Sequence, residues 1–150
     1  LSIVVLPLAS GAIQVRIAES LTILPIFFPE AIVGLFVGCA LVNLITGCAV
    51  FDVLFGSLVS LLAGVLTYIV SKKIKNNKWK FIVGGLFPVL LNSFLLPLIW
   101  FYAYGMIEYV YIIQVLLIMV GEMLSVYILG LVVFNVIGKY IDEKEQKKEL

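Results

Sequence analysis

Histidine is absent from this sequence, which removes the commonest metal ligand and general base. Cysteine is scarce: the sequence has only Cys39 and Cys48, which stand nine residues apart. That spacing is not typical of a zinc site or a redox pair, so we interpret both as small buried thiols. The sequence also lacks a Gly-rich phosphate loop and a Cys–His pair. We therefore expect no enzyme, no metal, no cofactor and no ATP site in this chain.

Charged residues are also few, at 13% of 150 residues, with a net charge of +1. This balance gives no strongly basic face, so nucleic acid is not an expected partner. Hydrophobic residues make up 63% of the chain and the mean hydropathy is +1.21, whereas soluble domains are about half apolar. We predict an all-α, polytopic membrane protein in which residues 1–150 form one integral-membrane domain.

Apolar segments follow one another along the chain. The first, Leu1–Ala9, lacks the charged leader of a signal peptide. Its residues make only about 13 Å of helix, and a span needs about 20 residues, so we expect the chain to begin partway through its first helix. Five segments follow: Val15–Phe28, Glu30–Cys48, Val53–Ser71, Lys80–Tyr104 and Met106–Gly138. The last is long enough that it must tilt, kink or protrude from the bilayer.

Lysine is concentrated in two places, which predicts the orientation. Five lysines lie within residues 72–80 and four follow Gly138. Two spans separate these groups, so both lie on one side, and the positive-inside rule makes that side cytoplasmic. Counting across the spans places residues 49–52 and 104–108 outside. The cytoplasmic tail is expected from about residue 139.

Polar residues gather at the start of the second apolar segment, Val15–Phe28. Arg16 and Glu19 are three residues apart, and Ser20 is four from Arg16, so on a helix they share a face. Gln14 adds an amide just ahead of them. An ion pair at a helix end that lowers the cost of membrane depth is one interpretation. A polar lip over a binding pocket is the other, and it is our prediction, because ionisable groups at membrane depth usually line a cavity or pathway.

Glu122 is the most informative single residue. It lies inside the last apolar segment, 17 residues before Lys139, which is about 25 Å of helix and places it in the outer half of the membrane. A carboxylate there must be paired, protonated or facing a polar cavity. A structural pairing, for instance with Arg16, and a role as ligand acceptor both stay open, and we predict the second. It shares one helical stripe with Tyr111, Val115, Ile118 and Ser125.

The Lys80–Tyr104 segment carries the remaining candidates. Asn92 lies between Pro88 and Pro97, and prolines inside a helix free backbone carbonyls and can widen a cavity. Trp100 and Tyr104 lie toward the outer end of this segment. An aromatic belt at the membrane interface is the default interpretation, and stacking on a planar ring from a pocket is the alternative.

Three other polar residues have structural interpretations. Glu30 follows a proline and suits a helix start, and Asp52 suits an N-cap for the next span, although an outward-facing Asp can also meet substrate. Asn43 lies within an apolar helix and is expected to bond a neighbouring helix. Two small-residue patterns predict close helix packing: Gly34 with Gly38, and Gly56 with Ser60 and Gly64.

Three blocks of residues resemble a known family. They are Val-Arg-Ile-Ala-Glu-Ser-Leu-Thr-Ile-Leu-Pro (15–25), Phe-Pro-Glu-Ala-Ile-Val-Gly-Leu-Phe-Val-Gly-Cys (28–39) and Asp-Val-Leu-Phe-Gly-Ser-Leu (52–58). In this order they look like the QueT family, the substrate-binding (S) components of energy-coupling-factor transporters for queuosine precursors. The match runs over residues 11–70 and is weaker beyond.

The resemblance implies a bundle of six transmembrane helices in the bacterial plasma membrane, with both termini cytoplasmic and the first helix truncated. It also implies two kinds of partner, a transmembrane coupling subunit and two cytoplasmic ATPases. The coupling surface in such proteins usually involves small residues of the first helix.

The path of Val15–Phe28 has two interpretations. If it is re-entrant rather than a full crossing, Arg16 lies on the cytoplasmic side with the lysines, and charge counting slightly favours this alternative. The resemblance favours six crossings.

The substrate implied by the resemblance is a 7-deazaguanine base or queuine. A guanine-like edge offers ring N–H and exocyclic amine donors, which a carboxylate of Glu122 or Glu19 can accept together. Asn92 or Gln14 can satisfy the remaining groups, and Trp100 or Tyr104 can cover the ring face. An S component for another vitamin or nucleobase stays an alternative. A non-transporting membrane scaffold is the alternative from a different class, and it would bind no nucleobase.

Overall fold

The computed structural model describes residues 17–104 and 111–147, without the side chains of Ile17, Ala103, Tyr104, Asp142 and Glu145. Its elements are η1 (Ile17–Ile26), α2 (Ala31–Ile45), η2 (Asp52–Gly56), α3 (Ser57–Lys73), α4 (Asn77–Tyr104), α5 (Tyr111–Met123), η3 (Leu124–Leu129) and α6 (Gly130–Gln146). η1 is a 3-10 helix, whereas η2 and η3 are π-helical segments that continue into α3 and α6. The described part is helical throughout its regular structure, as the sequence predicted.

Three helices of the described part are long and apolar enough to cross a membrane: Asp52–Lys73, Asn77–Tyr102 and Tyr111–Ile141. α2 is shorter, with 15 residues. η1 has ten residues and spans about 20 Å at the rise of a 3-10 helix. The protein is therefore a multi-pass membrane protein. The predicted first helix, Leu1–Ala9, lies outside the described residues, and so the count of six stays a prediction.

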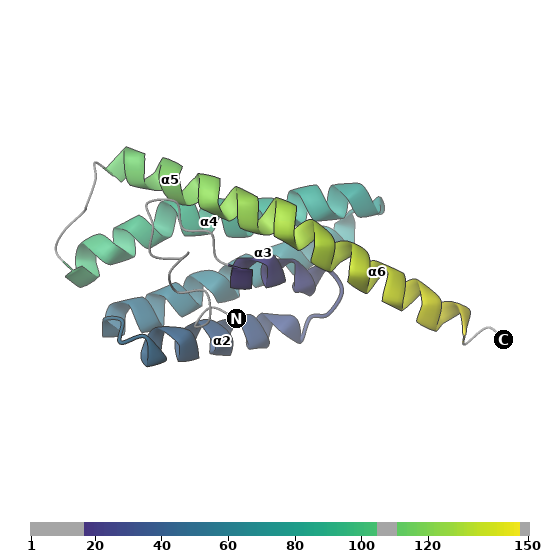
Figure 1. Cartoon of the computed structure of the whole chain (residues 1–150), viewed down its shortest axis with the longest axis horizontal. Coiled ribbons are helices and arrows are strands. Elements are labelled where there is room, and N and C mark those ends of the chain that lie inside the picture. The colour runs from purple at the N-terminus through teal and green to yellow at the C-terminus, as the bar shows by residue number, and fades with distance from the viewer. Residues whose placement is uncertain (1–16, 105–110, 148–150) are drawn as a thin grey trace.

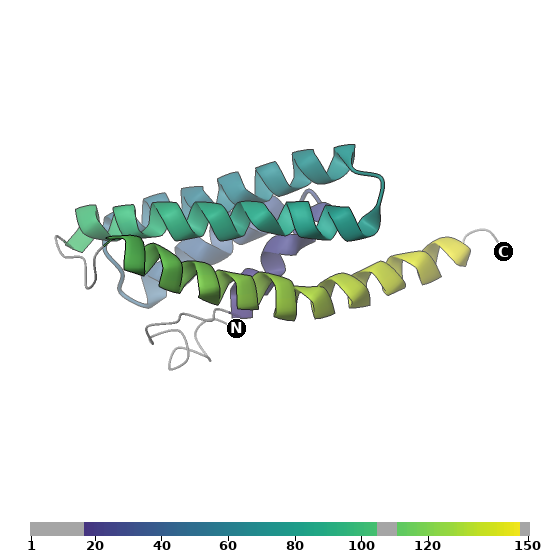
Figure 2. The ribbon, with the colours of Figure 1, turned by 90° about the horizontal axis from the view of Figure 1, so that it is seen from above.

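The long helices run side by side and share one long axis (Figures 1 and 2). α3 and α4 are joined by a short turn at the end from which α6 projects. α5, η3 and α6 form one continuous helix whose C-terminal part extends beyond the other helices. Its apolar stretch of 31 residues measures about 47 Å, more than the roughly 30 Å of a hydrocarbon core. The C-terminal end of this segment, which was predicted to be over-long, extends past the ends of the other helices.

The distribution of side chains differs from that in a soluble bundle, because polar side chains are buried beside apolar ones and many large apolar side chains are exposed. Small and polar groups are buried, namely Ser20, Thr22, Asp52, Ser57, Ser60, Thr67, Ser71, Asn92, Ser93, Glu122 and Ser125. Large apolar side chains face outward on every long helix, among them Val33, Leu54, Leu98, Leu116 and Val132. Small residues at helix interfaces and apolar ones toward lipid are what a membrane favours. A compact apolar cluster of Ile23, Phe81, Val89 and Val126 joins η1, α4 and η3.

Local signals explain where the helices end and begin. Gly47 adopts φ +71°, the left-handed conformation that glycine enters without a Cβ penalty. Cys48 N bonds Asn43 O at 3.0 Å and Gly47 N bonds Leu44 O at 3.2 Å, which together form a Schellman motif that closes α2. The Asn76 side chain accepts a 2.9 Å bond from Lys78 N and so caps the start of α4.

Pro88 leaves a gap in the hydrogen bonding of α4, and α3 fills it. A proline in a helix cannot donate to the carbonyl four residues earlier, which here belongs to Gly84. The hydroxyl of Thr67 donates to Gly84 O at 2.8 Å, and Thr67 is fully buried. The expectation that the prolines free backbone carbonyls is confirmed at this position.

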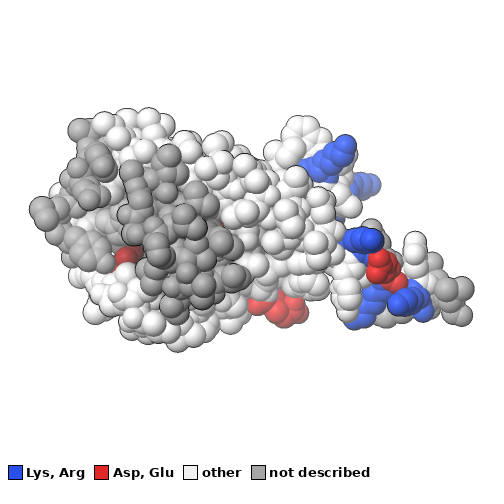
Figure 3. Space-filling model, viewed as in Figure 1, with Lys and Arg blue, Asp and Glu red and all other residues white. Residues whose placement is uncertain are grey.

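The lysines of the described part gather at one end of the molecule, as Figure 3 shows, where the α3–α4 turn and the end of α6 lie. This confirms that the 72–80 loop and the tail share a side.

Only one of the two predicted small-residue patterns packs closely against another helix. Gly64 packs against Pro25 and Ile32, whereas the space beside Gly34 and Gly38 is open. The predicted packing at Gly34 and Gly38 is therefore not made within the described part of the chain.

Candidate functional site

Three polar side chains from distant parts of the sequence meet inside the bundle. Asn92 Nδ2 of α4 donates to Glu122 Oε1 of α5 at 3.1 Å and to Glu19 Oε2 of η1 at 3.3 Å. Asn92 is 3% exposed and Glu122 is 2% exposed. Two carboxylates therefore converge on one amide in the interior. We call Glu19, Asn92 and Glu122 the inner site.

Close packing of η1 brings Glu19 to this position. Thr22 Oγ1 donates to Glu19 O at 2.6 Å and closes the turn that carries the carboxylate. Ile23 is 1% exposed and lies so close to Gly130 that a Cβ there would be 2.6 Å from Ile23 Cδ1. A larger residue at position 130 would therefore require the Ile23 side chain to rotate or η1 to move away from the long C-terminal helix.

The segment after Glu122 is also unusual. Leu124–Leu129 forms a π-helical turn, and such turns are rare and occur frequently at functional sites. Ser125 Oγ donates to Gly121 O at 2.8 Å within this region. A Cβ at Gly85 of α4 would lie 2.9 Å from Val126 Cγ1, so α4 and η3 also approach closely. The π turn changes the inward face of the helix immediately after the carboxylate.

A second polar cluster surrounds Asp52. Trp100 Nε1 donates to Asp52 Oδ1 at 3.3 Å, and Asn43 Nδ2 donates to Asp52 O at 3.1 Å. The N-cap prediction for Asp52 is wrong, because the helix has already begun at Val50 and the Asp52 side chain turns inward, 8% exposed. The prediction that Asn43 bonds a neighbouring helix is confirmed.

Sequence reasoning missed Gln114. Its Oε1 is buried and has no hydrogen-bond partner in the described part of the chain. It lies eight residues before Glu122 on α5, so the two share a face. The predicted stripe followed the neighbouring positions Tyr111 and Val115. The spacing of Gln114, Ile118 and Glu122 at intervals of four was the available signal.

The structure brings together some of the predicted site residues. Glu19, Asn92 and Glu122 meet directly, whereas Trp100 bonds Asp52. Gln14 and Arg16 lie outside the described residues, and so does the side chain of Tyr104. The polar lip around Arg16 therefore stays a prediction. Among the described residues, no group of three or more His, Cys, Asp or Glu side chains is placed to hold a metal ion.

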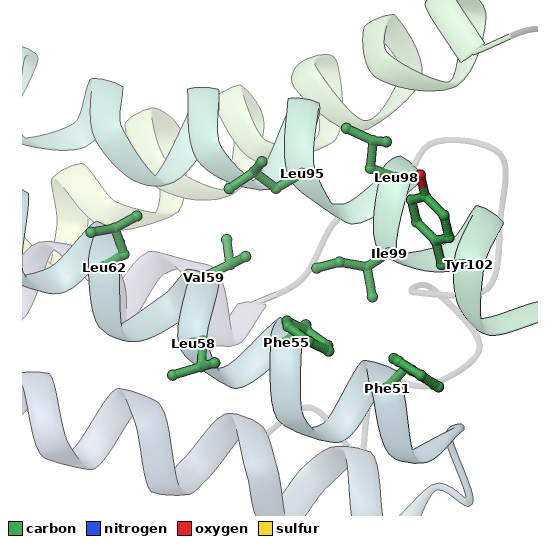
Figure 4. Close-up of a pocket in the computed structure, with 9 residues that line it drawn as sticks. All are labelled: Phe51, Phe55, Leu58, Val59, Leu62, Leu95, Leu98, Ile99 and Tyr102. Carbon is green, nitrogen blue, oxygen red and sulfur yellow. The ribbon is translucent and has the colours of Figure 1, made fainter.

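A groove of about 490 Å³ lies between α3 and α4, and its lining is apolar (Figure 4). The lining residues are Phe51, Phe55, Leu58, Val59, Leu62, Leu95, Leu98, Ile99 and Tyr102. Most of them belong to the outward-facing apolar surface, and the sticks in Figure 4 show one polar atom, the Tyr102 hydroxyl. This groove offers a lipid-like environment and little to orient a polar ligand, so the inner site is the better candidate.

A family model described as QueT transporter matches residues 1–139. The chain belongs to the QueT family. The match covers nearly the whole membrane domain, including all three residues of the inner site, and confirms the resemblance of residues 11–70. No curated protein and no solved structure matches the chain. QueT membership makes this membrane protein a transporter rather than an enzyme, and a small molecule is the expected cargo.

The inner site can accept hydrogen bonds from a donor group. A carboxylate is an acceptor with two oxygens, and charge-assisted bonds are roughly twice as strong as neutral ones. Glu19 and Glu122 present such groups from opposite elements, and the Asn92 amide fixes their orientation. Two acceptors thus lie beside one amide, of which the Glu122 carboxylate is buried and the Glu19 carboxylate is half-buried.

Proposed function

We propose that this chain is the S component of an energy-coupling-factor importer and captures a queuosine precursor, a 7-deazaguanine base or queuine, from outside the cell. The observation that carries the proposal is the convergence of Glu19 and Glu122 on Asn92 within a member of the QueT family.

The donor edge of a guanine-like base matches this arrangement. Its ring N–H and exocyclic amine point the same way and can bond both oxygens of one carboxylate. In the proposed complex the ligand displaces one of the two bonds of the Asn92 amide, whose freed N–H donates to the carbonyl group of the base, and the second carboxylate accepts from a further donor. Such a ligand would exchange bonds with groups that already pair with one another, so that the site holds hydrogen bonds both with and without the ligand. A base lacking the donor edge gains none of these bonds.

Transport requires partners in this proposal. A transmembrane coupling subunit and two cytoplasmic ATPases supply the energy, and this chain supplies recognition. Toppling of the S component in the membrane would then carry the inner site from the outer to the inner face.

Calorimetric titration of the detergent-purified chain tests recognition. We expect 7-deazaguanine and its derivatives to bind without ATP, and adenine and riboflavin to bind at least about 100-fold more weakly, because mismatched edges leave buried groups unpaired. Binding of riboflavin or another vitamin in place of deazaguanines would make the chain an S component with a different cargo. Binding of none of these compounds would favour the scaffold alternative.

Uptake into liposomes tests the energetics. We expect accumulation of radiolabelled substrate when the chain is reconstituted with its coupling subunit and ATPases and ATP is enclosed. The matched control is the chain alone in liposomes without an ion gradient. Concentrative uptake in that control would contradict the proposed division of labour.

A further inference from the structure

The turn between α3 and α4 concentrates positive charge that no neighbouring acid offsets. Residues 71–80 contain five lysines and no aspartate or glutamate. None of these lysines forms an ion pair with a described side chain, whereas Lys139 and Glu143 of α6 lie 3.9 Å apart. In Figure 3 the end of α6 accordingly shows blue and red atoms side by side. We give the name basic turn to the five lysines, which are Lys72, Lys73, Lys75, Lys78 and Lys80.

The basic turn lies at the depth of the lipid headgroups. The apolar span Asp52–Lys73 has 22 residues, or about 33 Å of helix, which is close to the roughly 30 Å of the hydrocarbon core. Only residues 74–76 connect α3 to α4, and the Asn76 side chain closes this connection by accepting a bond from Lys78 N. The connection is therefore too short to carry its charges far from the membrane surface.

Two aromatic side chains support this depth. Trp79 is 58% exposed, and tryptophan is enriched where a membrane meets water. Lys72 Nζ lies 4.6 Å from the centre of the Tyr68 ring, and the face of an aromatic ring attracts a cation. This contact holds the ammonium group at the end of the apolar span. The charged end of α6, in contrast, continues past the ends of the other helices (Figure 1).

We propose that the basic turn binds the headgroups of acidic phospholipids in the adjacent leaflet. Clusters of about four to eight basic residues beside a transmembrane helix attract anionic lipids, and each residue contributes roughly a factor of five to binding. A zwitterionic headgroup carries an ammonium group that offsets its phosphate, so the turn selects phosphatidylglycerol over phosphatidylcholine. Depth favours lipid over an acidic protein surface as the occupant, because the turn ends at the bilayer.

Native mass spectrometry of the detergent-purified chain tests this assignment. The micelles contain equal amounts of phosphatidylglycerol and phosphatidylcholine with the same acyl chains. We expect the parent chain to retain phosphatidylglycerol with a preference of at least about 10-fold. The combined changes Lys73→Gln, Lys75→Gln and Lys78→Gln, all at exposed positions, should reduce the preference to within about 2-fold.

The matched control removes the same charge from the end of α6 through Lys139→Gln, Lys144→Gln and Lys147→Gln, which are also exposed, and should keep the preference. Thermal melting confirms that each variant is folded. If the triple variant of the turn does not fold, Lys75→Glu takes its place. This single change reverses one charge in the connection and should lower the preference at least about 5-fold.

Melting of the parent chain with added anions separates lipid from other occupants. Phosphatidylglycerol should raise the melting temperature, and salt at about 1 M should abolish the rise, because the screening length falls to about 3 Å. Inorganic phosphate and polyglutamate should have no such effect. If either raises the melting temperature as phosphatidylglycerol does, the turn binds soluble anions or an acidic protein surface, and the lipid site is refuted.

The lipid measurements are equally decisive. Equal retention of the two lipids by the parent, or a preference that the turn variants leave unchanged, would refute the site. An equal loss of preference in the α6 control would show that the total charge of this end selects the lipid, which also contradicts a site at the turn. None of these measurements uses a transported substrate, so their outcome is independent of the proposed function.

Discussion

Asn92 and Glu122 hold α4 and α5 together by a buried hydrogen bond of 3.1 Å. The same amide nitrogen reaches Glu19 at 3.3 Å, so one side chain of α4 organises the carboxylates of two other elements. Hydrogen bonds to charged groups contribute about 1.5–3 kcal/mol. The Asn92 amide therefore has two roles: it orients the two carboxylates, and it stabilises the contact of α4 with α5 and η1.

Replacing Asn92 by Leu should lower both the stability of the protein and its affinity for 7-deazaguanine. The change removes the donor shared by two buried carboxylates, and we expect a loss of about 1–3 kcal/mol in the free energy of unfolding together with weaker binding of 7-deazaguanine. Asn135→Leu, at an exposed position in α6, is the matched control and should have little effect. Melting and calorimetry measure the two quantities. If the Asn92→Leu protein keeps its melting temperature and its affinity, Asn92 neither stabilises the bundle nor contributes to binding.

Thr67→Val should destabilise the bundle. Valine keeps the shape but withdraws the hydroxyl from Gly84 O, the carbonyl that Pro88 cannot satisfy. We expect a cost of about 1–2 kcal/mol. In the control Thr46→Val, the lost hydroxyl bonds lie within α2 at an exposed position, and the effect should be much smaller. Equal melting temperatures for the two variants would show that the α3–α4 bond adds no stability.

Gly130→Ala should also lower stability, although alanine favours a helix by about 1 kcal/mol over glycine. The new Cβ would lie 2.6 Å from Cδ1 of the fully buried Ile23, so the Ile23 side chain must take another rotamer in a packed interior or η1 must shift. Gly38→Ala is the matched control, because the space beside Gly38 is open, and it should keep or raise the melting temperature. A stabilised Gly130→Ala protein would show that η1 packs less tightly than described.

Much of the fold could be predicted from the sequence. Hydropathy and lysine placement are properties of whole segments, so the long helices and the shared side of their basic ends were correctly predicted. Caps and bulges depend on single residues. Asp52 looked like an N-cap because helix-start preferences are local, yet the helix begins at Val50 and tertiary contact with Trp100 turns the carboxylate inward.

The candidate site was predictable only in part, because it also depends on tertiary contacts between single residues. Glu19, Asn92 and Glu122 stood out because polar groups at membrane depth are costly, but no sequence pattern indicated that they meet. Gln114 was overlooked because helical periodicity permits several inward stripes, and the predicted stripe followed Val115, Ile118 and Glu122, which are all buried.

The orientation of the protein in the membrane is open to a direct test. We predict that the Lys72–Lys80 loop is cytoplasmic and that residues 49–52 are external. After Cys39→Ala and Cys48→Ala, a single cysteine is introduced as Val50→Cys or Asn76→Cys, both at exposed positions. An impermeant maleimide should label intact cells carrying Val50→Cys and not those carrying Asn76→Cys. The opposite pattern would invert the topology.

The most direct measurement of the central claim is the affinity of Glu122→Gln for 7-deazaguanine by calorimetry. Glutamine keeps the shape, but replaces one acceptor by a donor and removes the charge, so a bidentate bond to the donor edge is lost. Affinity should fall about 10- to 100-fold, whereas the matched control Glu30→Gln, at an exposed position, should bind as the parent does. If folded Glu122→Gln binds as tightly as the parent, Glu122 is a helix-packing residue and the inner site does not read the base.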